Sequence, residues 1–298
     1  MKKKILITGA GGMLGKAAYD ILSTRYNVIA TDIDLNEDWL EYLDVRDIQQ
    51  FETIFKKHKF DIIFHLAALT DLEYCEREFD DAWKTNALGV ENAALMAKKY
   101  NCEMIYISTA GIFDTPDKFT FNDFDNPSPK SIYGLSKYHG EKIVQLLVPN
   151  HYIFRAGWMM GSGMKDKKFV KKILNQIKDG VTELNVVDDK LGTPTYTYDF
   201  IYNMLGVIDK EYYGLYNQVC DGDCSRYDVA VEMIRLLNLN IPINKVDSDF
   251  FKEEYSAPRP YSEKLINLKL NSRNLNNMRH WKICLSEYME NYGKDYIK

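Results

Sequence analysis

Tyr133 and Lys137 lie four residues apart in a segment expected to be helical. Side chains at this spacing share one face of a helix, so the lysine ammonium can lie near the phenol and favour its ionised form. A phenol, whose ordinary pKa is about 10, then becomes usable as an acid or a base near neutral pH. The two residues therefore predict a site of proton transfer.

A second pair with the same spacing, Tyr138 and Lys142, follows in the same segment. The two tyrosines are five residues apart. At about 3.6 residues per turn, this separation places them on helix faces that differ by roughly 140°. Only one pair can therefore face a common site. Tyr133 opens the helix after a proline-containing loop, where side chains commonly face a cleft, whereas Tyr138 lies in mid-helix, so we assign catalysis to Tyr133 and Lys137.

A hydroxyl group is expected as the third member of this site. The predicted strand 104–107 ends directly before Ser108 and Thr109, and the end of a central strand is where a hydroxyl can reach a ligand. Serine and threonine at a strand exit also commonly cap a helix or bind a loop. The residue types alone leave that alternative open.

Glycines follow the first apolar run of the chain and precede a helical pattern. At such a turn a diphosphate can approach the bare backbone and the N-terminus of the helix. The residues predicted to bind a dinucleotide there are Gly9, Gly12, Met13, Leu14 and Gly15. Asp32 ends the next predicted strand, about 20 residues further on, where an acidic side chain hydrogen-bonds the adenosine ribose. A carboxylate there would repel a 2′-phosphate, so the sequence favours NADH over NADPH; the alternative is a structural turn followed by an exposed aspartate.

Two further segments are expected in the same pocket. Asp44 and Val45 precede the predicted helix 51–55 and can contact the adenine amino group and ring face, although Asp44 could also be a solvated turn carboxylate. Residues after the strand 62–64 leave room for a cofactor at the carboxyl edge of the sheet. These residues are Leu66, Ala67 and Ala68.

Short apolar runs alternate with helical patterns over the first half of the chain. The predicted strands are 5–7, 28–31, 62–64, 104–107 and 152–154, and the predicted helices are 14–22, 51–55 and 82–100. This alternation, with continuously apolar strands, is typical of a parallel sheet covered by helices on both faces. We therefore predict an α/β fold with a Rossmann-like, doubly wound parallel sheet.

A smaller mixed α/β region is predicted after Arg155, where loops, lysines and tyrosines become more frequent. Its predicted elements are helices at 169–177, 198–208, 227–237 and around 281–289, a strand at 184–187 and a loop at 241–260. We assign residues 1–155 and 182–206 to a dinucleotide-binding domain, and residues 156–181 and 207–298 to a substrate-binding region.

Composition argues against several classes of protein. The net charge of −5 and the pI of about 5.7 give no broad basic surface, so neither nucleic acid nor an anionic membrane is expected as a partner. The apolar run 5–7 breaks at once into Thr8 and Gly9, so we expect no export or membrane segment and predict a cytoplasmic protein. The five cysteines and five histidines show no disulfide or metal-ligand spacing, so we expect reduced thiols and no catalytic metal.

Motifs along nearly the whole chain carry a family resemblance. The glycine turn at 9–15, Ser108-Thr109, and Tyr133 with Lys137, in this order, resemble an extended short-chain dehydrogenase/reductase. Later stretches narrow the resemblance to the dTDP-4-dehydrorhamnose reductase family. These stretches are Arg155–Trp158, the lysine-rich helix after Phe169, Asp188–Thr195 and Ala257–Pro260.

This resemblance implies that NADH or NADPH reduces the 4-keto group of a nucleoside-diphospho-4-keto-6-deoxyhexose. Tyr133 would protonate the keto oxygen, Lys137 would bind the nicotinamide ribose and tune the phenol, and Thr109 would donate a hydrogen bond to the same oxygen. Arg259 would bind the nucleotide diphosphate, because a guanidinium suits phosphate oxygens; a rigid surface loop is the alternative. The other residues implied to bind substrate are Trp158 and Thr193. The resemblance also allows a homodimer.

The chain departs from the family pattern beside the expected sugar. Ala110 and Gly111 replace an Asp-Tyr pair, and Glu263 stands where the family typically has a serine, with Ser262 one position earlier. Both changes leave the identity of the sugar open. Ala110 and Gly111 also lack the acidic pair that a 4,6-dehydratase would need. A 4-epimerase with the same tyrosine and lysine, and a non-catalytic regulatory subunit on this scaffold, are the remaining alternatives.

Overall fold

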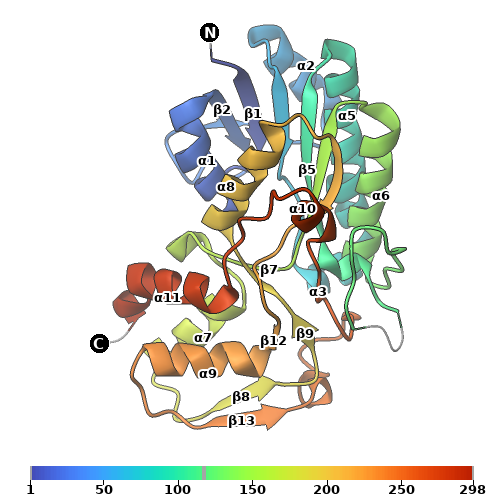
Figure 1. The fold of residues 1–298 in the computed structure, drawn as a ribbon. Helices are drawn as coiled ribbons and strands as arrows, with labels where there is room; N and C mark the ends of the chain where they lie inside the picture. The colour runs from blue at the N-terminus through green and yellow to red at the C-terminus, as the bar shows by residue number, and fades with distance from the viewer. Residues whose placement is uncertain (1, 116–118, 297–298) are drawn as a thin grey trace.

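A seven-stranded parallel sheet forms the core of the larger part of the molecule, in the upper half of Figure 1. The computed structural model describes residues 2–115 and 119–296. The strands of the sheet are β1 (Lys4–Thr8), β2 (Asn27–Asp32), β3 (Leu40–Tyr42), β4 (Ile62–His65), β5 (Glu103–Thr109), β6 (His151–Ala156) and β11 (Gly214–Asn217). They follow the order β11-β6-β5-β4-β1-β2-β3, and every neighbouring pair is parallel. This confirms the predicted doubly wound fold, whose strand order reverses between β1 and β4, where such sheets bind ligands.

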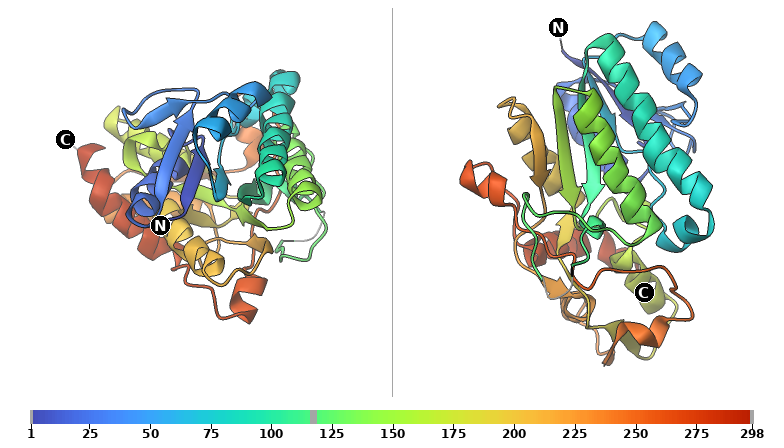
Figure 2. Two further views of the ribbon diagram at one scale, coloured as in Figure 1. Left: turned by 90° about the horizontal axis from the view of Figure 1, so that it is seen from above. Right: turned by 90° about the vertical axis from the view of Figure 1, so that its right-hand side faces the viewer.

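Helices cover both faces of this sheet (Figure 2). One face carries α1 (Met13–Arg25) and α8 (Thr197–Ile208), and the other carries α2 (Ile48–Lys57), α5 (Gly89–Tyr100) and α6 (Ile132–Leu147). Successive side chains of a strand point to opposite faces. Accordingly, Ile5 and Ile7 pack with α1 and α8, whereas Leu6 packs with α2, α5 and α6.

The long helix expected at 82–100 is not a regular α-helix throughout. It begins as α4 (Phe79–Trp83), passes through a π-helical turn at Lys84–Leu88 and continues as α5. A π-helical turn inserts an extra residue into the helix and is frequent near functional sites. Here the turn carries Asn86, which is fully buried.

A smaller region lies beyond the carboxyl ends of the strands (Figure 1). Its helices are α7 (Phe169–Lys178), α9 (Arg226–Leu236) and α11 (Trp281–Tyr292). Its paired strands are β7 (Trp158–Met160) with β10 (Pro194–Tyr196), β8 (Leu184–Val187) with β13 (Ile243–Val246), and β9 (Leu191–Gly192) with β12 (Cys224–Ser225). These elements enclose a separate hydrophobic core. Two short helices, α3 (Leu72–Arg77) and α10 (Leu268–Ser272), complete the set of α-helices in the described residues.

Two strands, β8 and β11, do not lie in the region to which the sequence-based division of the chain assigned them. β11 follows residue 206 yet extends the central sheet beside β6, and β8 pairs with β13 in the smaller region. The segment expected to be a loop at 241–260 contains β13, because two apolar residues at the ends of Ile243–Val246 give no recognisable strand pattern. The chain therefore passes between the two regions several times.

Three features of the described residues concern cysteine pairing, metal binding and membrane insertion. Cys75, Cys102, Cys220, Cys224 and Cys284 are buried free thiols. Within residues 2–115 and 119–296, no cluster of three or more His, Cys, Asp or Glu side chains is arranged to hold a metal ion. No helix in these ranges has the length and apolar character needed to cross a membrane.

Candidate active site

A cavity of about 1200 Å³ lies at the carboxyl edge of the central sheet and extends into the smaller region. Nearly all of the site residues expected from the sequence line it. They are Gly9, Gly12, Met13, Leu14, Gly15, Asp32, Asp44, Val45, Leu66, Ala67, Ala68, Thr109, Tyr133, Lys137, Trp158 and Arg259. Thr193 is not part of this lining, because its side chain is fully buried in the protein.

The glycine-rich turn between β1 and α1 fits a diphosphate group. Gly9 has a φ of 68°, and a Cβ there would lie 2.5 Å from the backbone nitrogen of Ala67, so this position requires glycine. A Cβ on Gly15 would lie 2.4 Å from the Ala10 carbonyl oxygen, so this glycine lets α1 pack closely. Gly12 caps α1 without a side chain that occupies the helix N-terminus, and a Cβ there would meet only the Gly9 carbonyl oxygen at 3.5 Å. The helix N-terminus is therefore available to phosphate oxygens.

Asp32 lies at the end of β2, directly beside this turn. Its Oδ2 accepts a hydrogen bond from the Gly11 N–H at 2.9 Å, and its Oδ1 accepts one from the Asp34 N–H at 3.0 Å. Both bonds fix the carboxylate at the cavity wall. The ribose-binding role expected of Asp32 stays a prediction.

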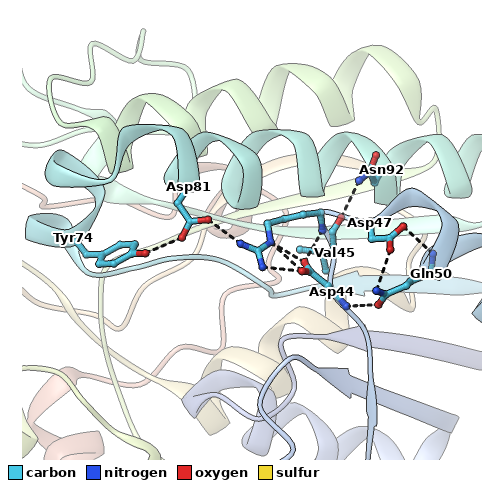
Figure 3. A network of polar contacts seen from close by, with 8 residues as sticks. Asp44, Val45, Asp47, Gln50, Tyr74, Asp81 and Asn92 are labelled. Carbon is cyan, nitrogen blue, oxygen red and sulfur yellow. Dashed lines mark hydrogen bonds and ion pairs between the residues drawn. The ribbon is translucent and has the colours of Figure 1, made fainter.

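A polar network surrounds Asp44 (Figure 3). Its carboxylate accepts hydrogen bonds from the backbone N–H of Arg46 at 3.0 Å and from the Arg46 guanidinium at 2.8 Å. The guanidinium lowers the pKa of Asp44 and also pairs with Asp81 at 2.8 Å, which accepts a hydrogen bond from the Tyr74 hydroxyl. Asp44 is therefore an oriented member of an ion-pair network rather than a solvated turn carboxylate.

Two buried asparagines hold the loops around the part of the cavity that Val45 and Leu69 line. Asn86, in the π-helical turn, accepts a hydrogen bond from the Leu69 N–H at 2.8 Å and donates to the Leu69 carbonyl at 2.9 Å and to Ser136 Oγ at 3.2 Å. Asn92 donates to the Val45 carbonyl at 2.9 Å (Figure 3). The sequence analysis missed both residues, because only the folded chain brings them to these loops.

Tyr133 and Thr109 meet at the centre of the cavity. Tyr133 lies in the first turn of α6, which Ser131 caps, and Thr109 is the last residue of β5. Burial raises the pKa of Tyr133 to about 12; a hydrogen bond with the Thr109 side chain opposes this shift, and the charge of Glu263 adds to it. A phenol with a raised pKa stays protonated at neutral pH, which is the form that a proton donor requires.

Lys137 lines the cavity one helical turn after Tyr133. Burial lowers the pKa of Lys137 to about 7, an effect that the Glu141 carboxylate opposes, and its Nζ lies 4.3 Å from the ring centroid of Tyr106. The spacing had suggested that the ammonium would favour the ionised phenol. That expectation is wrong for this structure, because burial raises the pKa of Tyr133 and outweighs the opposing hydrogen bond from Thr109.

The second tyrosine–lysine pair lies elsewhere. Tyr138 packs against a small apolar cluster that includes Phe113 and Phe121. The Nζ atom of Lys142 lies 4.9 Å from the centroid of the Tyr138 ring. Neither residue of this pair lines the cavity. Helical phase therefore separates the two tyrosines as expected.

Trp158 and Arg259 both have protein partners. The Trp158 backbone N–H donates to the Thr193 carbonyl at 3.0 Å, and its indole Nε1 donates to Glu263 Oε2 at 2.6 Å. Arg259 donates to Glu73 at 2.7 Å and to the Ala257 carbonyl at 2.9 Å. Arg259 is therefore partly neutralised by a carboxylate of α3.

Arg226, which the sequence analysis did not single out, also lines the cavity. Its guanidinium lies 4.3 Å from the centroid of the Trp158 ring and 5.0 Å from that of Phe169. Burial lowers the pKa of Arg226, and no hydrogen bond or ion pair joins its side chain to any residue in the described part of the chain. Position 226 starts a helix far along the sequence, so no local pattern indicated that it would reach this site.

The parallel sheet, the glycine turn and the cavity with Thr109, Tyr133 and Lys137 define the class of protein as an extended short-chain dehydrogenase/reductase. A family model described as "RmlD substrate binding domain" matches residues 2–294. The chain belongs to this family.

Known proteins similar to this chain agree with that assignment. The spore coat polysaccharide biosynthesis protein SpsK of Bacillus subtilis is 30% identical over 290 residues, which cover 96% of this chain and 97% of SpsK. A dTDP-4-dehydrorhamnose reductase of Clostridium acetobutylicum has a solved structure that matches with a TM-score of 0.89 and 36% identity, over 96% of this chain and 98% of that one. The dTDP-4-dehydrorhamnose reductase of Bacillus anthracis in complex with NADP matches with a TM-score of 0.88 and 30% identity, over 98% of this chain and all (100%) of that one.

Proposed function

We propose that this protein is an NAD(P)H-dependent reductase of a nucleoside-diphospho-4-keto-6-deoxyhexose. One observation carries the proposal: Thr109, Tyr133 and Lys137 line the same cavity as the glycine turn that fits a dinucleotide. Relatives at 30% identity or more that are named dTDP-4-dehydrorhamnose reductases support the substrate class.

Each polar group of the site has a role that its surroundings support. A bound nicotinamide cofactor supplies the hydride. Tyr133, kept protonated by its raised pKa, donates a proton to the keto oxygen. Thr109 Oγ1 accepts a hydrogen bond from the Gly111 N–H at 3.0 Å, and its hydroxyl, which hydrogen-bonds the Tyr133 phenol in this structure, turns to the same keto oxygen when substrate binds. Lys137 binds the ribose hydroxyls next to the nicotinamide.

The substrate diphosphate is assigned to the cationic wall of the smaller region. Arg226 has no hydrogen-bonded carboxylate among the described residues, although Glu263 interacts with it electrostatically, and Lys168 also lines the cavity. Arg259 joins them although Glu73 shares its guanidinium. Trp158 is the aromatic wall beside the sugar, whereas Thr193 supports Trp158 through its backbone rather than contacting substrate.

NADH is the proposed cofactor of choice, because the Asp32 carboxylate at the cavity wall would repel a 2′-phosphate. Asp32→Ala should therefore weaken NADH binding relative to NADPH, as measured by fluorescence titration. An unchanged ratio of the two dissociation constants would refute the ribose contact. The division into residues 1–155 with 182–206 and residues 156–181 with 207–298 stays a prediction, except that β8 lies in the smaller region and β11 in the central sheet. The homodimer and the cytoplasmic location also stay predictions.

The test is turnover by the purified protein. With NADH or NADPH and a panel of nucleoside-diphospho-4-keto-6-deoxyhexoses, the absorbance of the reduced cofactor at 340 nm should fall as one sugar is reduced. A 4-epimerase would interconvert sugars without net consumption of the cofactor, and a regulatory subunit would do neither. Either result, with correctly folded protein, would overturn the proposed reductase.

A further inference from the structure

The geometry points to Glu263 as a residue that determines sugar specificity, because its carboxylate is placed to accept a hydrogen bond from a sugar hydroxyl next to the reduced carbonyl. This inference rests on the proposed reductase function and deepens it. The two departures from the family pattern, at Ala110-Gly111 and at position 263, also lie next to each other in the structure.

Glu263 reaches the reaction centre from a distant loop. Its Oε1 lies 3.4 Å from the point that a Cβ on Gly111 would occupy, and Thr109 Oγ1 lies 3.4 Å from the same point. A Cβ at position 111 would therefore be in van der Waals contact with both oxygens. The Glu263 carboxylate and the Thr109 hydroxyl, which is assigned to the keto oxygen, therefore lie on the same side of Gly111.

Two contacts hold this carboxylate in place. The Trp158 indole donates a hydrogen bond to Oε2 at 2.6 Å, and the backbone N–H of Glu263 donates to the Leu191 carbonyl at 2.8 Å. The indole itself is fixed, because a Cβ on Gly192 would lie 2.3 Å from the ring. Glu263 is therefore oriented before substrate binds.

One oxygen of the carboxylate lacks a protein partner. Among the residues that the structure describes, Oε2 has the indole as its donor, but no donor reaches Oε1. An ionised carboxylate only accepts hydrogen bonds, and Glu263 lines the cavity. A ligand that satisfies Oε1 must therefore bring a donor close to Thr109 and Tyr133.

Nearby charges favour a hydroxyl over an ammonium as this donor. Arg226 interacts electrostatically with Glu263, and Lys168 and Arg226 repel each other across the same part of the cavity. A positively charged amino sugar would be attracted by Glu263 but repelled by both cations, whereas a neutral hydroxyl would bind Glu263 without this repulsion. The inferred substrate is thus a 4-keto sugar that keeps the hydroxyl adjacent to the carbonyl.

The decisive experiment compares two substrates across matched variants. One is the nucleoside-diphospho-4-keto-6-deoxyhexose that the wild-type protein reduces best, and the other is its analogue without the hydroxyl next to the carbonyl. The wild-type protein should prefer the hydroxylated sugar by more than about tenfold in kcat/KM, because a lost hydrogen bond to a charged group costs about 1.5–3 kcal/mol. Glu263→Ala should reduce the two sugars with nearly equal kcat/KM, and Glu263→Gln should give an intermediate ratio.

Two further variants separate recognition from general damage. Trp158→Phe removes the indole donor and should lower the preference partly, because Glu263 loses its orientation. Glu253→Gln alters an exposed glutamate outside the cavity lining and should keep the wild-type ratio. NADH affinity and circular dichroism should be the same in all variants.

The outcomes are distinguishable. If the wild-type protein reduces the hydroxylated sugar but Glu263→Ala keeps the full preference, the inference is wrong and the reductase function stands. A preference of the wild-type protein for a 4-keto amino sugar would also overturn the inference. If the wild-type protein reduces no 4-keto sugar nucleotide, the proposed function and the inference fall together.

Discussion

Burial shifts the two central side chains of the cavity in opposite directions. It raises the pKa of Tyr133 to about 12 and lowers that of Lys137 to about 7. Both shifts have one cause, because a low-dielectric surrounding disfavours the charged form of either group. At neutral pH the phenol is therefore protonated, and the lysine lies near its titration midpoint.

Tyr133→Phe should lower kcat by about 10²- to 10⁴-fold, the usual contribution of a positioned proton donor, while leaving NADH affinity nearly unchanged. Tyr138→Phe is the matched control, because this tyrosine packs in an apolar cluster and does not line the cavity. Steady-state kinetics and cofactor titration measure both effects. Equal damage from the two substitutions would contradict the helical-phase assignment.

Lys137→Met should stabilise the protein near neutral pH, at a cost in activity. The pKa of Lys137 in the folded state, about 7, lies below the unfolded value, so the unfolded chain binds more protons between about pH 7 and 10.5 and wild-type stability gains from a rise in pH. The advantage of the variant should therefore be largest below pH 7 and shrink by about 1 kcal/mol per pH unit above it. Urea unfolding at pH 7, 8 and 9 measures this, with Lys142→Met on the exposed face as control. The same pH dependence in both variants would refute the shift.

At the scale of elements, the regular first half of the fold could be predicted and the irregular parts could not. The strands of the central sheet that the apolar runs indicated, such as Ile62–His65, are buried on both faces, so their composition marks them. β11 (Gly214–Asn217) contains a glycine and an asparagine, and β13 (Ile243–Val246) has two exposed polar residues at its centre, so neither strand forms a continuous apolar run. For the same reason the glycine turn and Tyr133 were found from local motifs, whereas Arg226 and the contact between Glu263 and Gly111 required the folded chain.

The π-helical turn links α5 to the loop after β4. Asn86→Ala should lower the free energy of unfolding by about 1–3 kcal/mol, because it leaves buried polar groups of Leu69 unsatisfied. It should also weaken NADH binding, since Leu66 to Leu69 line the cofactor end of the cavity. Chemical denaturation and cofactor titration measure the two effects. Asn244→Ala, an exposed asparagine of β13, should change neither, and unaltered NADH affinity in Asn86→Ala would argue against this supporting role.

At the scale of the whole molecule, one carboxylate ties the two halves of the cavity together. Glu73 of α3 accepts hydrogen bonds from the backbone N–H groups of Ser256 and Ala257 at 2.9 Å, from the Ser256 hydroxyl at 3.1 Å and from Arg259 at 2.7 Å. These bonds fix a loop of the smaller region against the cofactor-binding half. The loop carries one of the cations assigned to the substrate diphosphate.

Glu73→Ala should raise KM for the sugar nucleotide by about tenfold or more while changing kcat less, because it releases the 256–259 loop and leaves the proton donor in place. Cofactor affinity should be nearly unaffected. Glu253→Ala, on the exposed surface of the adjoining segment, provides the control. A fall in kcat at constant KM would instead place Glu73 in the chemistry.

The chain passes repeatedly between its two regions, and this limits the ways in which the protein can be changed to accept a different sugar. After β6 the chain enters the smaller region, returns as α8 and β11 in the central sheet, leaves again for α9, and returns once more where α10 packs beside β11. Swapping the substrate-binding half between relatives would therefore need several junctions, and each would cut through a packed core. Substitutions at positions such as 111 and 263 leave the connections between the two regions intact. Because these positions lie next to each other at the cavity, they offer a shorter route to a different sugar.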